Sequence, residues 1–165
     1  MFSSILLQDI NTGDTFHCTL GTDSATKVSY SRSFRTVRSA TGSFSEETNT
    51  TTYAISISLQ NKHAFPILDL IVRDAVPMSD DKRVKVILRK PEGLANAKDG
   101  EVVNLNKDGL NVGWAKVVDG KGGEKEGKFE WKWKVDAGAQ IKLEAEWEVK
   151  APADVTWVEA VSYGE

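Results

Sequence analysis

The stretch of sequence that decides the fold runs from Lys128 to Val149. It reads KFEWKWKV (128–135), then a short break, DAGAQ (136–140), then IKLEAEWEV (141–149). In both arms apolar side chains occupy every second position, and Lys or Glu occupies the positions between them. A period of two is typical of a β-strand that buries one face and exposes the other to water. These residues therefore predict two amphipathic strands.

We expect the two arms to pair with each other as a hairpin, Phe129–Val149, at the centre of the fold. A symmetrical turn sets the large Trp131 opposite the small Ala145 on the apolar face. On the wet face the same register sets Lys132 opposite Glu144. Large-against-small packing and opposite charges both favour this register.

Short alternating or apolar runs recur along the rest of the chain, separated by turns rich in Gly, Pro, Asn and Asp. The clearest are residues 53–59 and 67–72, which we expect to form a second hairpin. Weaker strand signals lie at residues 5–7, 15–20, 27–37, 83–89, 101–105, 110–118 and 155–161. No apolar set recurs at helical spacing over several turns. The sequence therefore predicts an all-β fold: an antiparallel two-sheet β-sandwich, immunoglobulin-like or related, with little or no helix.

Length and composition are those of one globular domain spanning residues 1–165. The chain is 40% hydrophobic and 27% charged, and it is long enough to bury a core without disulfides or metals. Its net charge of -3 comes from acidic and basic residues mixed along the chain, so we expect no nucleic-acid partner. The single cysteine, Cys18, excludes an internal disulfide and favours a reducing compartment.

No targeting or membrane segment is recognisable in the sequence. Residues 1–9 lack a basic region, and no stretch approaches the roughly 20 apolar residues that a membrane span needs. We therefore expect a cytoplasmic protein with no membrane contact. The pattern Asn49-Thr50-Thr51 matches a glycosylation acceptor, which we expect to be unused without a signal peptide.

Two polar segments stand out between the strand signals. Residues 119–127 contain four glycines and charges of both signs with no apolar anchor, which predicts a mobile loop. Residues 27–38 carry four basic side chains, Lys27, Arg32, Arg35 and Arg38. These four side chains either form an anion-binding stripe or are the solvated charges of an outer strand face.

Three stretches together resemble one family. They are FHCTLG (16–21) leading into VSY (28–30), TTTY (50–53) running through VRDAVPMSD (72–80) to VKV (84–86), and GKFEW (127–131) running through LEAEWEVKAP (143–152). Their order and spacing are similar to the C-terminal domain of the mucoidy-inhibitor-like proteins in its fungal form, a domain of unknown function known as DUF4139. Members of that family are usually longer, with a predicted coiled-coil region before this domain. The resemblance implies strands and turns and carries no catalytic residue across.

The sequence contains none of the local motifs of common enzymes. There is no G-x-S-x-G, no H-E-x-x-H, no phosphate-binding loop, no G-x-G-x-x-G at a strand-to-helix turn, and no cysteine pair. His17 and His63 are expected to be surface or turn residues, although either can in principle meet Asp69, Asp74, Asp80 or Asp81 in space. We therefore expect a non-catalytic protein with no cofactor and no metal.

The five tryptophans raise a second hypothesis, a glycan-binding module. Trp131, Trp133 and Trp147 lie on the apolar faces of the two arms, where burial in the core is the ordinary explanation. Trp114 and Trp157 lie in less regular segments and are the candidates for an exposed ligand surface. Two functions remain open: a β-sandwich interaction module that docks on protein, and a glycan-binding module.

A polar segment suggests how a protein partner binds. Residues 41–52, which lead into Tyr53, are rich in Ser and Thr and have few lysines, as expected of an exposed edge strand. An exposed edge presents unpaired N–H and C=O groups that recruit another strand. The predicted partner is another protein or a second copy of the chain, the latter as a two-fold homodimer. The alternative is that residues 5–7 cover this edge and the protein is a monomer.

Overall fold

The structure is a computed structural model that describes residues 22–39, 47–105 and 109–158. The predicted strands at 5–7 and 15–20, and the candidates His17 and Cys18, lie outside these residues. The elements are β1 (Thr26–Ser39), β2 (Thr48–Asn61), β3 (Ile67–Ala75), β4 (Lys85–Lys90), η1 (Leu94–Asn96), β5 (Val103–Asn104), β6 (Asn111–Trp114), η2 (Glu124–Glu126), β7 (Lys128–Val135) and β8 (Gln140–Pro152).

The strands form two four-stranded sheets, which confirms the predicted all-β, antiparallel two-sheet sandwich. Sheet A has the order β1-β2-β8-β4, and sheet B has the order β3-β7-β6-β5. Every strand pair is antiparallel. The only helical elements in the described part of the chain are two short 3₁₀ turns, η1 and η2. None of the described residues form a helix that is long and apolar enough to cross a membrane.

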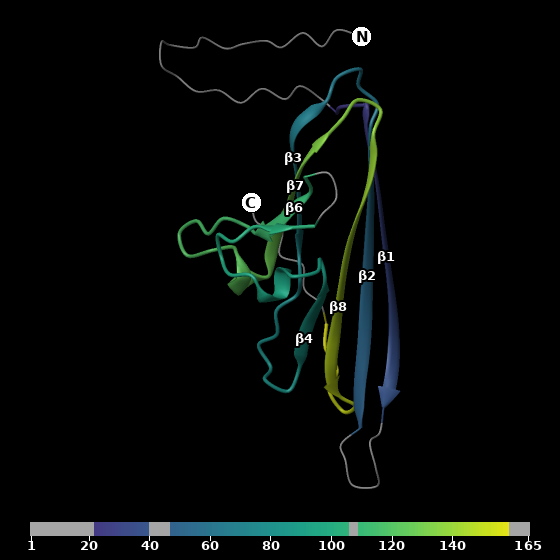
Figure 1. Ribbon diagram of the computed structural model, residues 1–165. Coiled ribbons are helices and arrows are strands. Elements are labelled where there is room, and N and C mark those ends of the chain that lie inside the picture. The colour runs from purple at the N-terminus through teal and green to yellow at the C-terminus, as the bar shows by residue number, and fades with distance from the viewer. Residues whose placement is uncertain (1–21, 40–46, 106–108, 159–165) are drawn as a thin grey trace, which may run out of the picture.

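The two arms of the stretch 128–149 do not pair with each other, contrary to the sequence prediction. β7 lies between β3 and β6, whereas β8 lies between β2 and β4 (Figure 1). The apolar faces of both arms contribute to one core cluster, so the arms are opposed across the core. Alternation fits either arrangement, because it specifies which face of a strand is buried and not which strand lies beside it.

The second predicted hairpin, 53–59 with 67–72, is wrong for the same reason. Residues 53–59 belong to β2 in sheet A, and residues 67–72 belong to β3 in sheet B. The hairpin partner of β2 is β1, in an unbroken register from Thr26 opposite Asn61 to Ser39 opposite Thr48.

A buried asparagine holds both places where the chain changes sheets. Asn61 is fully buried, and its Nδ2 donates hydrogen bonds to the carbonyl oxygens of Phe65, Val135 and Asp136 at 3.0, 3.2 and 3.1 Å. Its backbone N–H donates to the carbonyl oxygen of Ala139 at 2.9 Å. The contact with Phe65 fixes the crossing from β2 to β3, and the other contacts fix the crossing from β7 to β8. Asn61 therefore favours two arches between the sheets over two hairpins.

The core is built mainly from the two strands that the alternation identified. Phe129 and Trp131 of β7 and Trp147 of β8 are among the largest fully buried side chains. Trp133, expected in the core, is only half-buried and packs against its margin. The weaker strand signals are confirmed over shorter spans, as β4, the two-residue β5 and the four-residue β6. The described part of the predicted last strand, residues 155–158, is not a strand.

The predicted mobile loop at 119–127 contains η2 and is tied to the sandwich at its C-terminal end. The N–H of Val76 donates to the carbonyl oxygen of Gly127 at 2.8 Å, and the N–H of Lys128 donates to that of Gly123 at 3.0 Å. Gly127 has a positive φ of 65°, and an added Cβ there would collide with the carbonyl oxygen of Val76. Val118 and Lys121 also exchange two backbone hydrogen bonds of 2.9 Å, which close the tip of the loop. Mobility of the loop stays a prediction.

The two sheets differ in length, which leaves part of sheet A uncovered. β1, β2 and β8 span 14, 14 and 13 residues, whereas the strands of sheet B span between 2 and 9. Figure 1 shows the long strands of sheet A extending well beyond β3, β6 and β7, with β1 on the side away from sheet B. β1 therefore lies at the edge of sheet A with little of the sandwich over it.

Candidate functional site

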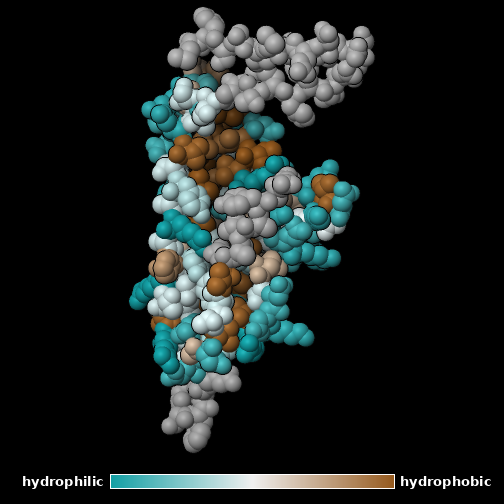
Figure 2. Space-filling model, turned by 180° about the vertical axis from the view of Figure 1, so that it is seen from behind, coloured by the Kyte–Doolittle hydropathy of each residue, from teal (hydrophilic) through white to brown (hydrophobic). Residues whose placement is uncertain are grey.

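β1 exposes an apolar face that its sequence pattern would normally bury. Val28, Tyr30 and Phe34 lie opposite Leu59, Ile57 and Tyr53 of β2, so they share the inner face of sheet A. Leu59 and Ile57 are buried, yet Val28, Tyr30 and Phe34 are 62%, 56% and 72% exposed. Seen from behind, Figure 2 shows hydrophobic side chains reaching the surface on that side of the molecule.

We call this region the β1 surface and define it by six residues of the strand. Val28, Tyr30, Arg32 and Phe34 are on the inner face, and Lys27 and Arg35 are on the outer face. All six side chains are exposed. The surface combines apolar side chains with positive charge along a single edge strand.

An aromatic row connects the β1 surface to the core. Phe34 lies opposite Tyr53 and Tyr53 opposite Trp147, so the row crosses β1, β2 and β8, and it ends opposite Leu88 of β4. The ring centroids of Phe34 and Tyr53 are 6.0 Å apart, and those of Tyr53 and Trp147 are 5.9 Å apart and stacked. Distances in this range are favourable for aromatic pairs. Exposure falls from 72% at Phe34 to 1% at Trp147, so the row runs from solvent into the core.

Arg32 places a positive charge over this row. Its guanidinium carbon lies 4.8 Å from the ring centroid of Tyr53 and 5.9 Å from that of Trp147. Such cation–π contacts hold a guanidinium flat against aromatic rings. The inner side of the β1 surface is therefore apolar with one fixed cation.

The charges of β1 are poorly balanced by their neighbours. β1 carries four basic residues and no acidic one, and β2 carries no charged residue at all. Arg38 forms an ion pair with Glu47, but within the described part of the chain Lys27 and Arg35 form none. The predicted anion-binding stripe does not lie on one face, because Arg32 and Arg38 alternate with Lys27 and Arg35. The basic side chains instead lie on both faces of the strand.

A hydrogen-bonded group closes the N-terminal end of β1. Asp23 accepts hydrogen bonds from the Thr26 hydroxyl and the Ala25 N–H, and its Oδ2 lies 2.9 Å from Nε2 of His63. The Thr26 hydroxyl, followed by His63, holds the pKa of Asp23 well below its usual range. The His63 ring also stacks on Phe65 at 4.6 Å. These contacts identify His63 as a turn residue with a structural partner.

Trp114 and Trp157, the two candidates for a ligand surface, do not come together. Trp157 packs edge-on against Tyr53 at 5.9 Å, so it extends the aromatic row of sheet A. Trp114 belongs to sheet B, where its Nε1 donates a hydrogen bond to the carbonyl oxygen of Ala97 at 2.8 Å. Its ring meets Phe129 edge-on at 6.4 Å. Both tryptophans are half-buried and pack against the core.

Trp114 does line a concavity of about 390 Å³ on sheet B. The polar groups around it include Glu101, Glu130 and Lys132. Glu130 is nearly buried and accepts a hydrogen bond from Nε of Arg73 at 2.8 Å, and Lys132 lies 3.3 Å from its other oxygen. The hydrogen bond from Arg73 lowers the pKa of Glu130, and Lys132 adds a smaller effect in the same direction. Most of this polarity is therefore already committed to internal contacts.

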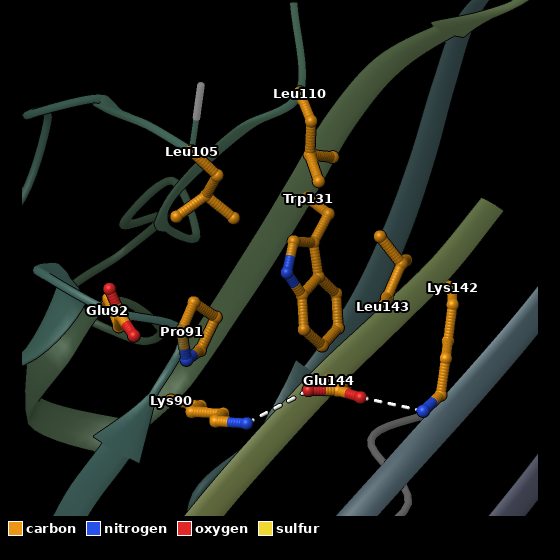
Figure 3. A pocket seen from close by; sticks show the side chains of 9 residues that line it. All are labelled: Lys90, Pro91, Glu92, Leu105, Leu110, Trp131, Lys142, Leu143 and Glu144. Carbon is orange, nitrogen blue, oxygen red and sulfur yellow. Dashed lines mark hydrogen bonds and ion pairs between the residues drawn. The ribbon is translucent and has the colours of Figure 1, made fainter. Parts of the chain in front are cut away.

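A second pocket, of about 270 Å³, opens between the two sheets (Figure 3). Trp131 points into it, and Glu144 crosses its mouth, 2.9 Å from Nζ of Lys90 and 2.7 Å from Nζ of Lys142. Lys142 and Lys90 together lower the pKa of Glu144 to about 2. The described residues that line this pocket include no Ser, Thr, Cys or His. The described lining therefore offers no hydroxyl, thiol or imidazole, and Glu144 is engaged by both lysines.

Metal binding finds no support in the described residues. Among residues 22–39, 47–105 and 109–158, no three His, Cys, Asp or Glu side chains come together around a point. Asp74 accepts a hydrogen bond from the N–H of Ala75, and Asp81 is bound by Arg83. Two of the four aspartates considered as partners of the histidines, Asp74 and Asp81, are thus engaged locally.

Sequence reasoning missed the β1 surface. The alternation of Val28, Tyr30 and Phe34 with polar residues is present in the sequence, but residues 27–37 are predicted from it only as a strand, with the basic side chains as the candidates for binding. A second missed feature is Nε1 of Trp147, a buried donor with no acceptor among the described residues. Neither feature has a local sequence signal, because both depend on what covers sheet A.

Comparison with known proteins identifies one family. The family model described as "Domain of unknown function (DUF4139)" matches residues 2–153, which is most of the chain. No curated protein and no solved structure matches the chain.

Proposed function

Because the chain belongs to the DUF4139 family, whose description names no activity, we propose from its surface that it is a non-catalytic β-sandwich module that docks on protein. The docking site is the β1 surface. The observation that carries the proposal is the exposure of Val28, Tyr30 and Phe34 on the inner face of sheet A, the face that is buried in the neighbouring strand β2. Contiguous exposed apolar side chains bounded by polar ones are typical of protein interaction sites.

The geometry of the four sheet edges supports the choice of β1. β3 and β4 each have a register shift, between Ile67 and Leu70 and between Leu88 and Lys90, and β5 spans only two residues. Bulges and short length are the usual ways in which edge strands avoid pairing with another chain. β1 spans 14 residues in one regular register and contains neither Pro nor Gly. Of the described edges, it is the long and regular one.

The predicted edge at residues 41–52 and Tyr53 is not available for docking. β2 runs from Thr48 to Asn61 and pairs with β1 on one side and with β8 on the other. A strand with two neighbours has no free edge, so we assign the docking contact to β1, the next strand outward. Residues 41–46 lie outside the described part of the chain.

A glycan-binding module remains the second candidate, and one observation favours it. The concavity beside Trp114 combines an aromatic ring with Glu101 and Lys132, a combination that suits a sugar. Against it, the Nε1 of Trp114 is already used by Ala97, and the ring is half-buried.

A display library of extended peptides as long as β1 tests the proposal. We expect the domain to enrich peptides whose binding is lost in Phe34→Ser. The matched control is Leu68→Ser on β3, because Leu68 is 71% exposed and Phe34 is 72% exposed. Enrichment that survives Phe34→Ser but not Leu68→Ser would move the site to sheet B.

A glycan array and a tryptophan-fluorescence titration with the bound sugars test the second candidate. Sugar binding that disappears in Trp114→Phe, together with no peptide enrichment, would replace the docking function by glycan binding. We expect no sugar-dependent change in fluorescence from the domain.

A further inference from the structure

We propose that the β1 surface binds an acidic, extended segment of another protein, which aligns beside the free edge of β1 and continues sheet A. This inference rests on the proposed function and specifies the chemistry of the partner. In the bound state, carboxylates of the segment lie beside Lys27 and Arg35, and its apolar side chains lie beside Val28, Tyr30 and Phe34.

The two edges of sheet A differ in how their charges are balanced. β4, at one edge, is also basic, but its neighbour β8 supplies carboxylates. Arg89 lies 2.8 Å from Glu148, and Lys90 lies 2.9 Å from Glu144. β1, at the other edge, has β2 as its only neighbour among the described strands, and β2 has no carboxylate. Arg38 is paired with Glu47, so the carboxylates that would balance Lys27 and Arg35 have to come from across the outer edge of β1.

The positive side chains of β1 lie on both faces of the strand. Lys27 and Arg35 are on the outer face and Arg32 is on the inner face, so the positive charge lies on both sides of the backbone. A flat partner that covered one face would reach only part of it. A strand in the plane of the sheet lies about 4.8 Å from β1 and presents side chains to both faces.

β1 itself alternates apolar and polar side chains. Apolar side chains at Val28, Tyr30 and Phe34 face one side, whereas the outer face carries three serines between Lys27 and Arg35. A segment that alternates apolar and acidic residues satisfies both faces at once. β8, which has the alternation Glu144, Glu146, Glu148 with Ala145 and Trp147, shows that such a sequence forms a strand in this sheet.

The same charges disfavour a second copy of the chain at this edge. Two β1 strands side by side would bring four basic residues from each copy together with no acidic residue in either strand. Like charges directly opposite each other destabilise strand pairing. A nucleic acid is also a poorer fit, because phosphate oxygens cannot donate hydrogen bonds to the carbonyl groups of a strand edge.

Fluorescence anisotropy with defined probes tests the inference on the full chain. The probe is a fluorescein-labelled peptide, as long as β1, that alternates valine and glutamate. The two comparison probes are the same peptide with lysine in place of glutamate and an oligothymidylate single strand. We expect the glutamate peptide to bind at least about tenfold more tightly than the lysine peptide, with a preference that weakens as salt rises and screens the charges.

Charge-reversal variants locate the binding. In the double variant Lys27→Glu and Arg35→Glu, we expect the glutamate peptide to lose at least about tenfold in affinity and the lysine peptide to gain. The matched control is Lys121→Glu with Lys125→Glu, which changes the charge of the chain equally at two exposed positions of the segment 119–127. Circular dichroism melting curves should be the same for both variants, because all four side chains are exposed.

Each remaining outcome overturns the inference. Equal binding of the two peptides, tighter binding of the oligothymidylate, or a dimer in light scattering that the double variant abolishes would each do so. If the peptide library still selects non-acidic binders that Phe34→Ser removes, the docking function stands and only the partner chemistry fails. If the library selects no binder at the β1 surface, the proposed function itself fails.

Discussion

β1 and β8 flank the same strand of the same sheet and follow the same alternating pattern, yet only one of them is buried. On β8 the inner residues Leu143, Trp147 and Val149 are each no more than 3% exposed. On β1 the inner residues Val28 and Phe34 are more than half exposed. Alternation therefore predicts which side chains share a face, and the opposing sheet decides whether that face is covered.

The difference arises from the dimensions of the two sheets. Sheet B is built from short strands, and it packs on the part of sheet A that contains β2 and β8. β1 adds a fourth strand to sheet A beyond that cover. An apolar face that the described strands do not cover is a place where a partner can be bound without unfolding anything.

The largest expected effect comes from truncating the buried end of the aromatic row. Trp147→Ala should destabilise the protein by about 3–5 kcal/mol, the cost that is typical of a large core side chain. Chemical denaturation measures this as a fall in the free energy of unfolding. A loss below about 1 kcal/mol would show that β8 is no better covered than β1.

The second effect tests the arches that oppose the two sheets. Asn61→Ala should cost about 2–3 kcal/mol, because it leaves the carbonyl oxygens of Val135 and Asp136 without their buried donor. The control is Asn104→Ala in β5, where the side chain is exposed. A neutral Asn61→Ala would mean that something other than Asn61 selects arches over hairpins.

A smaller effect is expected at the β4 edge of sheet A, where Glu144 forms ion pairs with Lys90 and Lys142. The pKa of Glu144 is lowered to about 2 from an ordinary value of 4.5, so its ion pairs stabilise the fold fully at pH values above 4.5. This stabilisation is lost as the pH falls from about 4.5 towards about 2, when the carboxylate takes up a proton. Because Glu144 and both lysines are substantially exposed, solvent screening limits the effect to about 0.5 kcal/mol.

Unfolding measured across this pH range in the wild type and in Glu144→Gln checks the prediction. The wild type should lose its small advantage as the pH falls, and the variant should show no such step. The same step in Glu144→Gln would assign the acid sensitivity to other carboxylates.

The smallest effect on stability is expected at the exposed end of the aromatic row. Phe34→Ala should change the free energy of unfolding by no more than about 0.5 kcal/mol, because its ring is mostly in water. Peptide binding at the β1 surface should nevertheless fall. A loss of stability comparable to that of Trp147→Ala would show that Phe34 belongs to the core and leaves no docking surface.

The sequence predicts the strands and their buried faces well but not their neighbours. The arms at 128–135 and 141–149 agree with β7 and β8 almost to the residue, because alternation is a local property. Their pairing depends on Asn61, more than 70 residues away, whose side chain holds the crossing at Val135. No local pattern in the arms contains that information.

The candidate site was harder to predict for a related reason. Trp114 and Trp157 were singled out because their segments are irregular, and both prove to pack against the core margin. The basic residues of β1 are visible in the sequence, but the absence of ion pairs at Lys27 and Arg35 within the described part of the chain follows from β2 being uncharged and adjacent, which only the register reveals. Exposure of Phe34 likewise depends on the extent of sheet B. A surface that is defined by missing cover cannot be recognised from the strand alone.

Amide hydrogen exchange along β1, compared with β8 in the same sample, tests the central claim most directly. In an antiparallel strand with one neighbour, every second N–H points to the free edge. We predict that alternate amides of β1 exchange rapidly while those of residues 146–150 of β8, which lie between β2 and β4, are all protected, and that the glutamate–valine peptide protects the rapid set. Uniform protection of β1 in the free protein would contradict the account, because its edge would then already be covered.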